Sequence, residues 1–368
     1  MTLHSSIDKM GTPVRGSLGD SWRATGDYSG QDMIKESIAK LVASTDLSRA
    51  QAAQAMTRIM SGEATPAQIA AFVTALRMKG ETVDEITGCA EAMRDKATPV
   101  RCSRRPLIDT CGTGGDGSGT FNISTATAIV AAGAGATVAK HGNRAASSRC
   151  GSADVLEELG VRIDMSPEQV EDCLEQVGFG FMFAPIFHKS MKHAAKPRRE
   201  LGIRTIFNLV GPVTNPAGAD CQVMGIFAPE LTEPMAMVLR NLGASRAFVV
   251  CGSDGLDEIT ITGPTRVSEV RDGEVTTHNI TPDELDVDTA DKKDLKGGDV
   301  RTNAGIIIDI LNGREGAPRE IVVANAGACL VATGVAATFR EGTAQARGAI
   351  DSGGALEKLE QLRQISRA

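Results

Sequence analysis

The feature that most constrains the fold is a glycine-rich loop at residues 112–119. Glycine occupies five of its eight positions; the apolar run Leu107-Ile108 precedes it, and a helix-like run begins near Asn122. Glycine at this density lets successive backbone N–H groups turn inward and form an anion-binding nest. The helix behind the loop adds free N–H groups and the positive end of its dipole. The segment therefore predicts a strand, a phosphate-binding loop and a helix.

The surrounding residues limit which phosphate ligand the loop binds. No Lys-Ser or Lys-Thr follows the last glycine, so the loop is not the P-loop of nucleoside triphosphatases. Residues 112–117 match the G-x-G-x-x-G pattern of dinucleotide-binding proteins. However, five more residues precede the helix, and the next strand-like run, 137–139, ends in Lys140 instead of an acid. A nicotinamide-dependent dehydrogenase stays open as an alternative, while Lys140 favours additional phosphate.

Two basic segments interrupt a chain whose net charge is −7. In residues 140–154, basic side chains alternate with amides and hydroxyls, which together neutralise and orient phosphate. Residues 188–204 hold six basic side chains and one acid, Glu200. The first segment predicts a phosphate contact; the second is either a binding surface or a solvated helix face.

A pair of acids, Asp257 and Glu258, follows the apolar run 247–251. Ligand sites of α/β sheets lie at the carboxyl ends of strands. Two carboxylates beside a phosphate site suit Mg²⁺, which combines such ligands with phosphate oxygens and water. The alternative is a solvated acidic surface loop with little packing.

The pattern along the chain predicts two structural parts. Residues 1–30 are polar and glycine-rich and are expected to be disordered. Four helices follow, at about 33–43, 48–61, 66–79 and 83–96, with Ser48, Thr65 and Thr82 as N-caps. From residue 107 onward, short apolar runs alternate with helical patterns, as in a sheet covered by helices.

Composition excludes several classes of protein. With 42% apolar residues over 368 positions, the chain can fill a sizeable core. Its eight cysteines contain no C-x-x-C pair, which indicates reduced thiols and a cytoplasmic location. No apolar run is long enough to span a membrane, and the overall acidity argues against general nucleic-acid binding.

Several motifs, in order over residues 31–365, resemble the anthranilate phosphoribosyltransferase family. They are Gly112-Thr113-Gly114-Gly115-Asp116, Asn122-Ile123-Ser124-Thr125, Lys140-His141-Gly142-Asn143-Arg144, Ser147-Ser148, Gly151-Ser152-Ala153-Asp154, Pro197-Arg198, Asn208, Gly211-Pro212, Asn215-Pro216 and Asp257-Glu258. The resemblance implies an α/β fold with a nucleoside-phosphorylase-like architecture: a small all-helical domain and a larger α/β domain with a mostly parallel central sheet. The helical domain would cover 31–100 with a return segment near 200–217, and the α/β domain 105–199 and 218–368.

The resemblance also implies the site residues. Phosphoribosyl pyrophosphate (PRPP) would be bound by Gly112, Gly115, Asp116, Thr120, Asn122, Ile123, Ser124, Thr125, Lys140, His141, Gly142, Asn143, Arg144, Ala145, Ala146, Ser147, Ser148 and Ser152. Anthranilate would be bound by Gly112, Asn143 and Arg198. Two Mg²⁺ ions per subunit would be held by Ser124, Asp257 and Glu258.

The implied reaction is attack of the anthranilate amine on C1 of the ribose as pyrophosphate departs, in tryptophan biosynthesis. An aromatic amine is neutral at pH 7, so no covalent nucleophile and no general base are expected, and Lys140 would stabilise the leaving group. The family further implies a homodimer formed through the helical domain. Two alternatives remain beside the dehydrogenase: a pyrimidine nucleoside phosphorylase and a non-catalytic nucleic-acid-binding relative of the fold.

Overall fold

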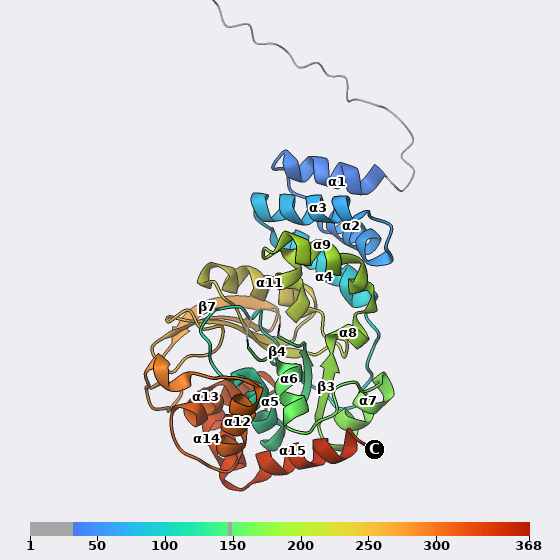
Figure 1. The fold of residues 1–368 in the computed structure, drawn as a ribbon. Coiled ribbons are helices and arrows are strands. Elements are labelled where there is room, and N and C mark those ends of the chain that lie inside the picture. The colour runs from blue at the N-terminus through green and yellow to red at the C-terminus, as the bar shows by residue number, and fades with distance from the viewer. Residues whose placement is uncertain (1–31, 146–148) are drawn as a thin grey trace, which may run out of the picture.

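A layer of helices lies at one end of a larger α/β body in the computed structural model (Figure 1). The structure describes residues 32–145 and 149–368, so the predicted disordered tail lies outside the described residues. The first helices are α1 (Asp32–Val42), α2 (Arg49–Ser61), α3 (Pro66–Lys79) and α4 (Val83–Asp95). Each end lies within one residue of its predicted position.

Local hydrogen bonds explain why these boundaries are readable in the sequence. The side chains of Ser48, Thr65 and Thr82 each accept the backbone N–H of the third helical residue, and the side chain of that residue accepts the backbone N–H of the cap. This capping box satisfies two donors that the helix leaves free. Helix α2 ends at Gly62 in the left-handed conformation, φ 77°. The predicted caps are confirmed.

The α/β body is built on one seven-stranded sheet of order β3-β2-β1-β4-β5-β6-β7. Its strands are β1 (Leu107–Asp109), β2 (Thr137–Gly142), β3 (Phe179–Phe183), β4 (Cys221–Gly225), β5 (Arg246–Gly252), β6 (Thr265–Arg271) and β7 (Glu274–Ile280). Strands β1 to β5 are parallel, whereas β6 and β7 pair antiparallel at one edge. The mostly parallel sheet is therefore confirmed. From β1 the chain adds β2 and β3 on one side and later β4 and β5 on the other, so a topological switch point lies between β1 and β4, where such sheets bind ligands.

Helices cover both faces of the sheet. The remaining helices are α5 (Ile123–Gly133), α6 (Ser152–Glu158), α7 (Pro167–Gln176), α8 (Ala184–Phe187), α9 (Lys192–Leu201), α10 (Ile206–Val210), α11 (Thr232–Asn241), α12 (Val300–Leu311), α13 (Ala317–Ala332), α14 (Phe339–Asp351) and α15 (Gly354–Ile365). Short 3₁₀ turns occur at Lys189–Met191, Gly211–Val213, Pro229–Leu231 and Lys292–Leu295. Helices α5, α13, α14 and α15 pack together on one side, and α11 packs on β5, β6 and β7 (Figure 1).

The helical layer shares its core with one face of the sheet. Successive strand residues point to opposite faces: Val223 and Phe248 join the core around α5 and α13, while Met224 and Val249 join the core of the helical layer. Helix α10 falls within the predicted return segment 200–217 and packs on α3 and α4, and the preceding α9 packs on α2 and α3. No helix in the described part of the chain is long and apolar enough to cross a membrane.

Candidate active site

The glycine-rich loop connects the carboxyl end of β1 to the start of α5, as predicted. Gly114 and Gly115 both have positive φ, 64° and 75°, a backbone conformation that residues other than glycine rarely adopt. The Thr113 N–H donates to the Gly225 carbonyl at the end of β4 (2.9 Å). A Cβ on Gly112 would lie only 2.8 Å from the same carbonyl oxygen. The loop is therefore fixed across the switch point by backbone contacts.

Lys140 is a buried cation beneath this loop. Its side chain is almost fully buried on β2, and its Nζ donates to Thr110 Oγ1 (2.8 Å) and to Ser124 Oγ (3.4 Å). Ser124 lies in the first turn of α5, where the positive end of the helix dipole favours anions. The structure thus brings together Lys140, which is predicted to stabilise the leaving group, and Ser124, a predicted metal ligand.

Three carboxylates, Asp116, Asp257 and Glu258, lie close to one another, and the charge of Lys140 acts on one of them, Glu258. Burial, followed by the nearby charge of Asp116, raises the pKa of Asp257 to about 7. Burial and the charge of Asp257 raise the pKa of Glu258 well above its usual value, although Lys140 acts in the opposite direction. Asp116 Oδ1 accepts from the Ser118 N–H (3.2 Å), whereas Oδ2 is buried without a hydrogen-bond partner among the described residues.

The turn that carries Asp257 and Glu258 is not the solvated acidic loop of the alternative interpretation. Both residues are half-buried, and a Cβ on Gly225 would overlap the Asp257 carbonyl. The expectation of little packing was therefore wrong. The expectation failed because the local sequence of an acidic turn does not reveal which other part of the backbone packs against it.

The segment after β2 folds back on the start of α6. The Ser152 hydroxyl donates to the Asn143 carbonyl (3.3 Å), and Gly142 packs against the Ser152 side chain. Asp154 accepts the backbone N–H groups of Ala145 and Gly151, at 2.9 Å each. Ala146, Ser147 and Ser148, which the resemblance places over PRPP, lie outside the described residues.

Several predicted PRPP residues have side chains engaged elsewhere. The exposed Arg144 guanidinium pairs with Asp154 (2.8 Å) and Glu157 (2.9 Å). Ile123 and Thr125 are buried in the core. The Asn122 amide donates to the Cys150 carbonyl (3.2 Å) and accepts from Asn303 (2.9 Å). Thr120 forms a β-bridge with Lys296. For Ile123 and Thr125, only the backbone is available to a ligand.

The two side chains predicted to bind anthranilate, Asn143 and Arg198, are not hydrogen-bonded to each other in the described part of the chain. Arg198, on α9, is half-buried, its guanidinium carbon lies 5.1 Å from the Phe207 ring centroid, and burial lowers its pKa. No carboxylate among the described residues forms an ion pair with it. Asn143 is exposed, and no hydrogen bond joins it to Arg198 within the described chain. Of the 188–204 cluster, Lys189, Lys192, Lys196 and Arg199 are exposed, which fits the solvated-face interpretation for those four.

Buried polar residues behind the site were missed in the sequence. Asp109, at the end of β1, accepts from the Cys111 N–H (3.1 Å), the His141 N–H (3.1 Å) and the Asn215 amide (2.7 Å). Burial raises its pKa to about 6. One ligand atom each of Asp109, Cys111 and His141 lies within 4.8 Å of the others. Because both Asp109 oxygens already accept hydrogen bonds, we interpret Asp109 as a tie between β1 and β2.

The buried histidine pair was also missed. The ring centroids of His141 and His188 lie 4.9 Å apart. Burial lowers the pKa of His141 to about 3 and that of His188 to about 4. Both rings are therefore neutral at physiological pH. His141 and His188 are far apart in the sequence, and no local pattern indicates that their rings meet.

Comparison with known proteins identifies the family. Residues 104–356 match the glycosyl transferase family α/β domain, and residues 35–97 match its helical bundle domain. The chain is 55% identical over 330 residues to an anthranilate phosphoribosyltransferase from Moorella thermoacetica, covering 90% of this chain and 97% of that protein. It is 56% identical to the Acetivibrio thermocellus enzyme of the same name, at 90% and 96% coverage. The chain belongs to the anthranilate phosphoribosyltransferase family.

Solved structures of this family agree with the fold. The enzyme from Thermus thermophilus superimposes with a TM-score of 0.86 at 46% identity, covering 90% of this chain and 99% of that one. The Saccharomyces cerevisiae anthranilate phosphoribosyltransferase in complex with PRPP and Mg gives 0.84 at 26% identity, with 91% and 99% coverage. These relatives support the transferase prediction and the predicted fold, and not the phosphorylase alternative.

Proposed function

We infer that the chain transfers the phosphoribosyl group of PRPP to the amine of anthranilate, giving N-(5-phosphoribosyl)anthranilate and pyrophosphate, a step of tryptophan biosynthesis. The observation that carries this inference is the meeting of a glycine nest, a buried lysine and three carboxylates at one switch point. That combination suits a substrate with several phosphate groups and a metal-assisted leaving group.

The residues present fit Mg²⁺. Burial and the charge of Asp116 raise the pKa of Asp257, and burial with the charges of Asp257 and Asp116 raises the pKa of Glu258. An Asp116 oxygen lacks a partner among the described residues, so a divalent cation would relieve the repulsion among the three carboxylates. We propose that Ser124, Asp257 and Glu258 hold two Mg²⁺ ions per subunit, and Asp116 is a further carboxylate beside them. Bound Mg²⁺ supplies counter-charge to the departing pyrophosphate.

The chain's own residues then bind and orient the substrates. Backbone N–H groups of the glycine-rich loop receive phosphate oxygens, although that of Thr113 is not among them because it donates to the Gly225 carbonyl. The positive end of α5 and the Lys140 ammonium supply positive charge against the leaving group. Arg198 receives the anthranilate carboxylate, because its guanidinium is half-buried and has no acid partner among the described residues. The anthranilate amine needs no base to become a nucleophile, so positioning is the main demand on the protein.

The decisive assay follows the loss of anthranilate fluorescence with PRPP and Mg²⁺, and with each of them omitted. We expect loss only in the complete mixture. Unchanged fluorescence in the complete mixture, or phosphorolysis of thymidine without PRPP, would contradict the assignment.

We also propose a homodimer that forms through the helical layer. Val42 and Met78 are 73% and 84% exposed, at the ends of α1 and α3, which pack side by side. Large apolar side chains exposed on neighbouring helices are typical of an interface. Light scattering should give twice the 38.5 kDa chain mass, and Met78→Asp should shift it toward a monomer; a monomeric wild type contradicts the proposal.

A cytoplasmic location is the last part of the proposal. All eight cysteines are free thiols, which persist in a reducing compartment. Fractionation of the native host with detection of the chain would test it.

A further inference from the structure

Arg204 contacts the phosphate loop from outside the proposed substrate site. It lies between Gly202, which ends α9 in the left-handed conformation, and Thr205, which precedes α10. Thr205 N–H donates to the Asn208 side chain (3.0 Å), so the backbone on the far side of Arg204 is fixed. From this anchored position the Arg204 guanidinium donates a hydrogen bond to the Gly115 carbonyl.

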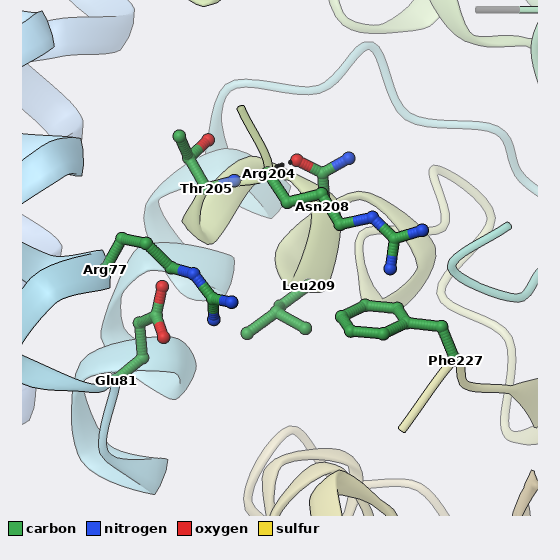
Figure 2. Close-up of a pocket in the computed structure, with 7 residues that line it drawn as sticks. All are labelled: Arg77, Glu81, Arg204, Thr205, Asn208, Leu209 and Phe227. Carbon is green, nitrogen blue, oxygen red and sulfur yellow. Dashed lines mark hydrogen bonds between the residues drawn. The ribbon is translucent and has the colours of Figure 1, made fainter. Parts of the chain in front are cut away.

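The guanidinium has a specific seat. Its central carbon lies 3.9 Å from the Phe227 ring centroid, two residues beyond the end of β4. Figure 2 shows the guanidinium over this ring, in a small pocket whose other wall is formed by Arg77 and Glu81 of the helical layer. A planar cation stacked on an aromatic face loses most of its rotational freedom. No carboxylate among the described residues pairs with Arg204, so its partners are the ring and the loop carbonyl.

Gly115 is the residue that permits this contact. A Cβ at Gly115 would lie 2.7 Å from the Arg204 guanidinium nitrogen, and its φ of 75° disfavours side chains. The glycine therefore serves two purposes, because it allows both the loop conformation and the approach of the arginine.

Fixing the Gly115 carbonyl also orients an N–H group. In a planar trans peptide, the carbonyl of Gly115 and the N–H of Asp116 point in opposite directions. With the carbonyl held toward Arg204, the Asp116 N–H points away from Arg204. The same N–H belongs to a residue whose side chain lies beside Asp257.

We propose that Arg204 is a positioning residue for PRPP, which keeps the Gly115–Asp116 peptide turned so that its N–H faces the pyrophosphate. The proposal rests on the proposed function, because it assumes that the loop binds the pyrophosphate of PRPP. Arg204 itself does not touch the reacting atoms. Its effect is on binding of the phosphate substrate and not on the acceptor.

Calorimetry on the full chain tests this with two probes, PRPP and inorganic pyrophosphate, each with Mg²⁺. We expect Arg204→Met to lower the affinity for both probes by about tenfold or more, because one charge-assisted contact is lost. The KM for anthranilate should stay within about twofold of the wild type, since a defect limited to one substrate's binding leaves the other unchanged. Arg199→Met, which removes an exposed arginine of the same basic segment, is the matched control and should bind both probes normally.

Two further variants separate geometry from charge. Arg204→Lys keeps the charge but loses the planar fork, so it should fail like Arg204→Met; normal binding by Arg204→Lys would overturn the proposal and leave only a charge effect. Phe227→Leu removes the ring and should weaken both probes in part. Melting temperatures near the wild type confirm folding, and a change in the amide ¹⁵N shift of Asp116 reports the turned peptide even in a variant of lower stability.

The outcomes distinguish the two levels of inference. If the wild type binds pyrophosphate but does not consume anthranilate, the proposed function fails while Arg204 can still be judged from pyrophosphate binding. If the wild type is active and Arg204→Met binds both probes normally, or loses only anthranilate binding, Arg204 has no positioning role at the loop.

Discussion

Replacing Asp257 with asparagine should stabilise the metal-free protein while disabling it. In the folded chain, burial and the charge of Asp116 raise the pKa of Asp257 from 3.8 to about 7. One pKa unit corresponds to about 1.4 kcal/mol. Ionised Asp257 therefore destabilises the folded state by up to about 4 kcal/mol, an upper limit because the neighbouring acids share the repulsion.

The pH dependence gives the prediction its sign. Between about pH 4 and pH 7 the folded state holds a proton on Asp257 that the unfolded state has lost, so wild-type stability falls as pH rises through this window. The asparagine side chain of the variant cannot ionise, so the variant does not lose this contribution. The advantage of Asp257→Asn should thus be near zero at pH 4 and largest above pH 7.

Urea unfolding at pH 5 and pH 8, in the presence of a chelator, measures the difference. The control is Asp254→Asn in the same turn, whose carboxylate accepts from the Leu256 N–H (3.1 Å) and from the Thr260 and Thr262 hydroxyls (3.0 and 2.9 Å). That variant should be less stable than the wild type at both pH values, because the substitution weakens hydrogen bonds that the Asp254 carboxylate accepts. If Asp257→Asn is less stable than the wild type at pH 8, the electrostatic reasoning is refuted.

The same acids should couple metal and substrate. In the wild type, Mg²⁺ and PRPP should each tighten the binding of the other by the same factor, because phosphate oxygens complete the shell of the ion. The double variant Asp257→Asn/Glu258→Gln should lose that coupling and most turnover while remaining folded. If the double variant keeps the Mg²⁺ dependence of the wild type, the metal binds at another site.

Three further results are expected. Arg198→Ala should raise the KM for anthranilate through a loss of about 1.5–3 kcal/mol with PRPP binding intact, whereas Arg199→Ala should not; equal steady-state effects would remove Arg198 from the acceptor site. Gly225→Ala should displace the Asp257 backbone, which a Cβ would overlap, and titration calorimetry should show loss of Mg²⁺-dependent PRPP binding; normal binding would contradict it. Ser48→Ala should cost about 1 kcal/mol of unfolding free energy, measured in urea, and no change would show that the cap is dispensable.

The parts of the fold that the sequence predicted are those determined locally. Thr82 and Glu85 are three positions apart and complete one capping box, so their pattern is visible without knowledge of the tertiary structure. The glycine loop is similar, because positive φ at Gly114 and Gly115 is a property of the residues themselves. The runs that became β1 and β5 were readable because strands of a parallel sheet are apolar on both faces.

The rest depends on contacts between distant segments. Arg204 was one basic residue among six until its position on Phe227, 23 residues later, became visible. His141 and His188 meet only because β2 and β3 are paired and the chain then turns back. No local pattern encodes contacts between segments so far apart in the sequence. The sequence therefore predicted the residue types of the site well, but it predicted less well which side chains face the site.

The clearest case is the packing of bare backbone at the switch point. Gly112, Gly225 and Asp257 come from the phosphate loop, the end of β4 and the acidic turn, and each glycine lies where a Cβ would overlap or crowd the next segment. With no side chain between them, these segments lie in direct backbone contact, and the hydrogen bond from the Thr113 N–H to the Gly225 carbonyl holds the phosphate loop against the end of β4. The raised pKa values of Asp257 and Glu258 thus follow from the same close packing that places them beside the phosphate loop. The fold holds three acids in an arrangement that is unfavourable until a cation arrives, and this is why we expect metal and PRPP to bind together.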